Sequence, residues 1–173
     1  MDRRNSIALI ALALALTALL SSCGWSGKPM DASGLDYKDE GIEIVGLTAN
    51  TMTVTPAELA GLDCVDRTVK AENSYGSTIT RRVQGPLLDT FLSKYGGKVG
   101  VGDISSVTFE ATDGYKVTLD RSDLGKMRVV FGIMIDGKAL AGAGRPLRII
   151  MTNTPATDWI EGVNRVIFNV KET

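Results

Sequence analysis

The residues with the clearest chemical potential are two arginines that follow a glycine-broken loop, Arg145 and Arg148. Gly142 and Gly144 free the backbone of that loop from steric restriction, and the apolar run 149–151 that follows predicts a core strand. A guanidinium offers a planar fork of donors suited to phosphate or carboxylate, so this pattern indicates an anion site built against a scaffold. The alternative is a surface loop whose arginines pair with nearby acids. Because side chains alternate along a strand, at most one arginine can line a given pocket.

Three more residues are candidates for the same kind of site. Arg67 stands alone on the otherwise apolar face of a predicted strand, where a buried guanidinium would require a carboxylate or a bound anion. Tyr115 could donate a phenolic hydrogen bond into a cleft or pack beside its turn. Ser74 lies in a turn that would face Arg148 across a pocket. We predict no catalytic or metal-binding residue, and the candidate anion-binding set is Arg67, Ser74, Tyr115, Arg145 and Arg148.

The composition excludes several classes of chemistry. The chain has no histidine, which removes imidazole-dependent hydrolases, histidine-ligated haem and most zinc and copper sites. Its formal net charge is −1 and its basic residues are scattered, so no nucleic-acid partner is expected. The two cysteines are Cys23 and Cys64. If Cys23 is modified, Cys64 has no partner and the domain folds without an internal disulfide.

The N-terminus has the features of an export signal. Arg3 and Arg4 precede an uncharged, mainly apolar run over 7–20, which is too short to span a membrane. The residues that follow, Leu20-Ser21-Ser22-Cys23, are similar to the lipobox of bacterial lipoproteins. We therefore expect a signal peptide over 1–22, a lipidated Cys23, and attachment to the extracytoplasmic face of the cell membrane through acyl chains. The alternative is a buried structural cysteine after an ordinary signal peptide.

The rest of the chain predicts one α+β domain of hairpins and short helices. Residues 23–41 are polar and glycine-punctuated, so they are predicted to be a flexible tether, and the domain is placed at 42–173. Thr55-Pro56 with Glu58 forms a capping box that starts a helix ending at Gly61. Asp113-Gly114 between alternating runs predicts a hairpin. The other predicted strands are 42–47, 52–54, 62–73, 78–83, 127–135, 149–151 and 163–170, and the other helices are 85–95 and 120–125.

Four separated segments resemble a known family. They are 85–92 (GPLLDTFL), 113–115 (DGY), 145–150 (RPLRII) and 159–160 (WI), and they occur in this order. With the capping-box helix ahead of them, they resemble the oxidoreductase molybdopterin-binding domain of the sulfite oxidase family, over roughly 48–170. The resemblance implies an α+β fold, a molybdopterin cofactor and a molybdenum bond from one cysteine at the end of a strand. It also matches Arg148 to an arginine of that family.

The chain departs from the family where the chemistry should be. The cysteine is expected near 72–75, and none is present there. Cys64 lies at the opposite end of the same predicted strand, about 25–30 Å away. Asp158 precedes Trp159 where relatives often have a phosphate-binding lysine. We therefore predict a non-catalytic module that binds an anionic small molecule or a protein partner, without a cofactor.

Two alternatives remain open. One is a molybdopterin-dependent oxidoreductase with atypical metal ligation. The other is a solute-binding lipoprotein that feeds a transporter.

Overall fold

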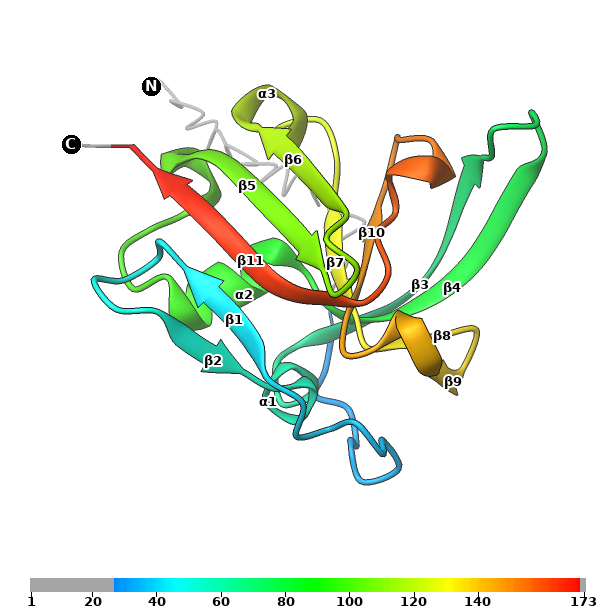
Figure 1. The fold of residues 1–173 in the computed structure, drawn as a ribbon, viewed down its shortest axis with the longest axis horizontal. Helices are drawn as coiled ribbons and strands as arrows, with labels where there is room; N and C mark the ends of the chain where they lie inside the picture. The colour runs from blue at the N-terminus through cyan, green and yellow to red at the C-terminus, as the bar shows by residue number, and fades with distance from the viewer. Residues whose placement is uncertain (1–26, 172–173) are drawn as a thin grey trace, which may run out of the picture.

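The computed structural model describes residues 27–171, and the predicted signal peptide and Cys23 lie outside them. Three sheets and a few short helices make up the described chain (Figure 1). The predicted α+β class is therefore confirmed. Within the described residues, no helix combines the length and the apolar character needed to cross a membrane.

The largest sheet has five strands in the order β2-β1-β11-β5-β6. Strand β1 runs parallel to β11, and the other neighbours are antiparallel. The predicted hairpin at Asp113-Gly114 is present, with Gly114 at a φ of 85° that favours glycine. The strands are β1 (Ile42–Val45), β2 (Met52–Val54), β5 (Ile104–Ala111), β6 (Lys116–Asp120) and β11 (Val163–Val170).

The other two sheets have the orders β3-β4-β8-β9 and β10-β7. Strands β3 and β4 form a long hairpin whose tip extends away from the rest of the fold (Figure 1). The strands are β3 (Cys64–Glu72), β4 (Thr78–Pro86), β7 (Val129–Gly132), β8 (Met134–Ile135), β9 (Lys138–Ala139) and β10 (Arg148–Met151).

Two predicted elements differ from the structure. The single strand predicted over 127–135 is divided at Ile133: β7 pairs with β10, whereas β8 pairs with β4. The helix predicted to begin at Gly85-Pro86 begins at Leu88, because Gly85 and Pro86 continue β4. Strand β4 crosses β7 so closely there that a Cβ on Gly85 would lie 1.9 Å from the carbonyl oxygen of Phe131. Glycine is therefore required by this crossing and does not mark a helix start.

The helices are short, and each of the three α-helices buries apolar residues in the core. The capping box of α1 is confirmed, with Thr55 Oγ1 accepting from the Glu58 N–H at 3.2 Å and Glu58 Oε2 accepting from the Thr55 N–H at 2.7 Å. Helix α2 buries Phe91, which stacks on Phe131 with ring centroids 4.9 Å apart. The helices are α1 (Pro56–Ala60), α2 (Leu88–Tyr95), α3 (Arg121–Leu124), and the 3-10 helices η1 (Val101–Asp103), η2 (Gly142–Gly144) and η3 (Ala156–Asp158).

Residues 27–41, here called the N-terminal strap, pack on the domain. Leu35 and Tyr37 are 4% and 1% exposed. The Met30 N–H donates to the Ala60 carbonyl at 2.7 Å, and Lys28 and Cys64 exchange backbone hydrogen bonds at 3.2 and 3.1 Å. The flexible tether predicted over 23–41 is therefore wrong for 27–41, because apolar residues without periodicity still become buried: Leu35 and Tyr37 form a small cluster with Leu140.

Tyr37 fixes the strap to the two residues that flank the β8–β9 hairpin, Ile133 and Leu140. Its hydroxyl donates to the Ile133 carbonyl and accepts from the Leu140 N–H at 3.0 Å. Both backbone groups are in buried residues. Burial is the main cause that raises the pKa of the Tyr37 phenol.

We expect Tyr37→Phe to lower the free energy of unfolding by about 1–3 kcal/mol, because it leaves the Ile133 carbonyl and the Leu140 N–H without a partner. The measurement is thermal and denaturant unfolding followed by circular dichroism, with a melting temperature several degrees lower. Tyr115→Phe is the matched control, since that tyrosine is 52% exposed and should show no change. Equal stability of the two variants would contradict the role given to the Tyr37 hydroxyl.

Candidate functional site

Arg145 contacts the N-terminal strap. Its guanidinium pairs with Asp36 at 3.1 Å and with Glu40, and its Cζ lies 5.5 Å from the centroid of the Tyr37 ring. The hydrogen bond that Arg145 donates to Glu40 is the main cause that raises the pKa of Arg145. The strap thus supplies two carboxylates and an aromatic face to one cation. Arg145 therefore stabilises the packing of the strap on the domain.

Arg148 is also paired, in a more buried setting. It begins β10, its side chain is 21% exposed, and its Nη2 lies 2.6 Å from Oε1 of Glu161. Burial lowers the pKa of Arg148, and the charge of Glu161 acts in the opposite direction. The pair formed by Arg81 and Asp136, 3.7 Å apart, adds opposing contributions to the same pKa. Within residues 27–171, Arg148 Nε is one of three buried side-chain atoms without a hydrogen-bond partner, and the others are Arg165 Nε and Glu110 Oε2.

The structure does not bring the predicted site residues together into one pocket. Ser74 lies at the exposed tip of the β3–β4 hairpin, and Tyr115 lies at the turn of another hairpin, in the five-stranded sheet. Arg67 shares a strand face with the buried Val65 and Val69 as predicted, but its side chain is exposed. The prediction of a buried guanidinium at Arg67 is therefore wrong, because a long side chain can carry its charge to solvent from an apolar face.

A cavity of about 740 Å³ lies where the N-terminal strap meets the four-stranded sheet. We call it the strap pocket. Its basic residues are Lys28 and Arg67, and Asp31 and Asp66 supply two carboxylates. Arg82 donates two hydrogen bonds to Asp66, which lower the pKa of that carboxyl. The pocket has balanced charge, so it does not select anions by charge alone. The other lining residues are Gly27, Pro29, Met30, Cys64, Val65, Gln84 and Met134.

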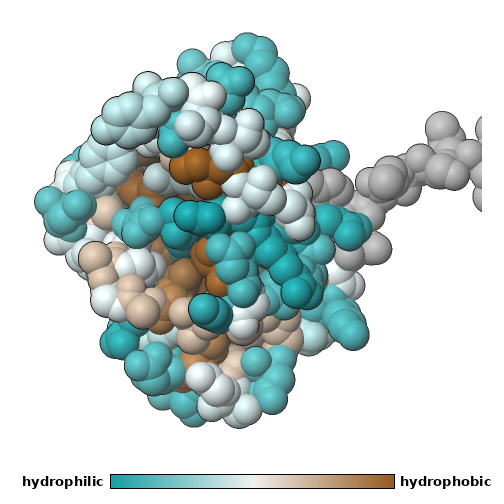
Figure 2. Space-filling view, turned by 90° about the vertical axis from the view of Figure 1, so that its right-hand side faces the viewer, coloured by the Kyte–Doolittle hydropathy of each residue, from teal (hydrophilic) through white to brown (hydrophobic). Residues whose placement is uncertain are grey.

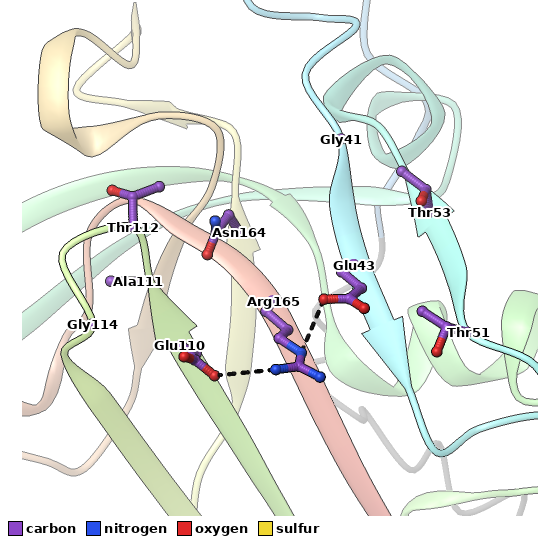
Figure 3. Close-up of a pocket in the computed structure, with 10 residues that line it drawn as sticks. All are labelled: Gly41, Glu43, Thr51, Thr53, Glu110, Ala111, Thr112, Gly114, Asn164 and Arg165. Carbon is purple, nitrogen blue, oxygen red and sulfur yellow. Dashed lines mark ion pairs between the residues drawn. The ribbon is translucent and has the colours of Figure 1, made fainter.

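A second cavity, of about 570 Å³, lies on the five-stranded sheet (Figure 3). We call it the sheet pocket. Arg165 on β11 lies between Glu43 on β1, at 2.9 Å, and Glu110 on β5, at 3.8 Å. Lys116 pairs with Glu110 at 3.1 Å. The charges of these four groups balance, and none of them is an activated nucleophile. The pocket therefore offers polar contacts to a bound molecule and no catalytic group. It was not predicted because Glu43, Arg165 and Glu110 become neighbours only through the register of β1, β11 and β5.

The residues present do not fit a molybdenum–thiolate site. The residues at 72–75, where the ligand was expected, form the outer end of the β3–β4 hairpin, and Tyr75 there is 90% exposed. Cys64 is 5% exposed, and its thiol faces the carbonyl oxygens of Leu59 and Ala60 at 3.4 and 3.7 Å. Burial raises the pKa of this thiol to about 12. Within residues 27–171, no group of three or more acidic, cysteine or histidine side chains is arranged to hold a metal.

Cys64 should stay unmodified by iodoacetamide at pH 8 in the folded chain, because the thiolate is the reactive form and burial keeps the thiol neutral. Mass spectrometry of the peptide that contains Cys64 measures the modification, and the same reaction in denaturant is the control. Since the folded pKa of about 12 lies above the ordinary value of 9.0, the stabilising effect of the neutral thiol is complete below pH 9. It is lost as the pH rises through about 12, and Cys64→Ala lacks this loss. Rapid alkylation of the folded chain would contradict the assignment.

Comparisons with known proteins give a likeness of fold. No family model matches the sequence, and no curated protein matches it. Among solved structures, the sulfane dehydrogenase SoxCD from Paracoccus pantotrophus is similar, with a TM-score of 0.64 and 17% sequence identity. The match covers 81% of this chain and 40% of the SoxCD chain, so this chain spans less than half of that neighbour. The likeness confirms the predicted α+β fold of the sulfite oxidase molybdopterin-domain type.

Proposed function

We propose that this chain is a membrane-anchored, extracytoplasmic binding or interaction module built on a molybdopterin-domain scaffold, without redox catalysis. The observation that carries the proposal is the chemistry of its one described cysteine. Cys64 is buried, faces two carbonyl oxygens and has a pKa of about 12, so it does not offer the thiolate on which molybdenum ligation depends.

The placement of the arginines supports the same proposal. Arg145 and Arg148, the strongest sequence candidates for holding an anionic cofactor, pair with Asp36, Glu40 and Glu161. Carboxylates that already satisfy a guanidinium compete with any phosphate for the same donors. Polar surface for a partner remains at the strap pocket and the sheet pocket, and neither contains a catalytic constellation.

The proposed location rests on the N-terminal sequence. Residues 20–23 match the lipobox pattern, and the strap begins at Gly27, four residues after Cys23. Four extended residues span roughly 13 Å, which would hold the domain close to the membrane surface.

Molybdenum analysis distinguishes the proposal from a molybdopterin-dependent oxidoreductase with atypical ligation. The full chain is made in a host that synthesises molybdopterin, purified, and analysed by inductively coupled plasma mass spectrometry beside a molybdoenzyme from the same host. We expect only background molybdenum in this chain. Stoichiometric molybdenum would overturn the proposal, and its loss in Cys64→Ser would assign the ligand.

The anchor is tested by fractionation of cells that express the full chain. We expect the unaltered chain to sediment with membranes and Cys23→Ala to appear in the soluble extracytoplasmic fraction, because the acyl chains supply the membrane affinity. Cys64→Ala is the matched control, because it removes the other thiol and should leave the chain in the membrane fraction. Cys23→Ala that still sediments with membranes would refute the lipid anchor.

A further inference from the structure

Within residues 27–171, no strand pairs with the outer edge of β3 in the four-stranded sheet, and only Lys28 bridges to it, at Cys64. Strand β3 has nine residues and pairs on one side with β4 over its full length. On its other side, the backbone hydrogen bonds within the described residues are the two between Lys28 and Cys64. No proline lies within β3. Such an edge presents a row of free N–H and C=O groups to another strand.

The bridge at Cys64 shows which residues present these groups. Because the N–H and C=O of Cys64 face Lys28 and not β4, every second residue along β3 faces the same way. The outward-facing backbone groups are therefore those of Asp66, Thr68, Lys70 and Glu72. The side chains of all four are exposed. The side of the molecule that lies at the right of Figure 1 is mainly hydrophilic, with hydrophobic residues visible in its recesses (Figure 2).

The charges on this edge match a second copy of the same edge in one register. When two β3 strands pair antiparallel about a two-fold axis at Thr68, Asp66 of each copy lies opposite Lys70 of the other, and Thr68 lies opposite Thr68. On the other side-chain face, Val65 lies opposite Ala71, and Arg67 lies opposite Val69. Opposite-charge and Thr–Thr pairs of this kind stabilise an antiparallel sheet.

Neighbouring registers are opposed by like charges. An axis at Arg67 places two arginines opposite each other, and an axis at Val69 places Asp66 opposite Glu72. An axis at Lys70 places two lysines together. Axes nearer the ends pair few residues, since the Lys28 bridge occupies Cys64 and the turn begins after Glu72. The strand is thus self-complementary at one register over residues 65–71.

We propose that β3 is a self-association surface, through which two copies of this chain form a continuous eight-stranded antiparallel sheet centred on Thr68. This inference rests on the geometry and charge of β3 and is independent of the proposed lack of catalysis. A two-fold axis makes the contact closed, so it yields a dimer and not a filament. If both copies are attached to one membrane, their high local concentration favours the pairing.

The proposal is tested by cross-linking the full chain in membranes with a short bifunctional thiol reagent. We expect Thr68→Cys to give a covalent dimer on a denaturing gel, since Cα atoms directly opposite in a hydrogen-bonded pair are about 5.5 Å apart. The matched control is Thr80→Cys, an exposed residue of β4 opposite Lys70. In the proposed dimer, three strand spacings separate the two Thr80 positions by about 14 Å or more, so Thr80→Cys should not cross-link. The parent chain accounts for any reaction of Cys23 and Cys64.

Two further variants test the pairing without a cysteine. Thr68→Pro removes an N–H that faces the open edge, so the fold should persist while the dimer measured by native mass spectrometry is lost. Lys70→Glu places like charges opposite Asp66 in both symmetric pairs, and the dissociation constant should rise about tenfold. A folded Thr68→Cys chain that cross-links no more than the parent or Thr80→Cys would overturn the proposal.

Discussion

The contact between the N-terminal strap and the β8–β9 region is the constraint on which much of the remaining structure depends. Tyr37 joins two buried backbone groups that lie on either side of β8 and β9, and Arg145 holds the adjacent carboxylates of Asp36 and Glu40. Tyr37 satisfies one backbone group on each side of the β8–β9 hairpin, and Arg145 pairs with two carboxylates of the strap. A segment that composition alone presents as a linker thereby becomes part of the folded domain.

This constraint also explains why the most promising sequence features do not form a ligand site. Arg145 would be available to an anion if the strap were a free tether, but in the structure its donors face the strap. Arg148 is also paired within the fold, because a half-buried guanidinium needs a nearby carboxylate and Glu161 provides it. The scaffold resembles that of the sulfane dehydrogenase SoxCD, while Arg145 and Arg148 are paired with carboxylates of this chain. In such a chain the fold does not determine the function.

The elements that could be predicted are those specified by residues close together in the sequence. Thr55 and Glu58 specify the start of α1 through contacts three residues apart, and Asp113-Gly114 specifies a turn through its own backbone preferences. The strand 163–170 was predicted with the bounds that β11 has. The helix start predicted at Gly85 is wrong because a glycine is required there by the close carbonyl oxygen of Phe131, which lies on another strand. Likewise, the partners of Arg145 lie more than a hundred residues away, and no local pattern indicates them.

The central claim, that the strap is part of the fold and commits Arg145 to it, is tested most directly by hydrogen exchange of single amides in the full chain. The informative amides are those of Met30, which donates to Ala60, and Leu140, which donates to Tyr37. Both amides should exchange as slowly as the amide of Ile149, which lies in the core and donates to Ile160. Exchange of Met30 and Leu140 at the rates of an unstructured peptide, with Ile149 still protected, would contradict it.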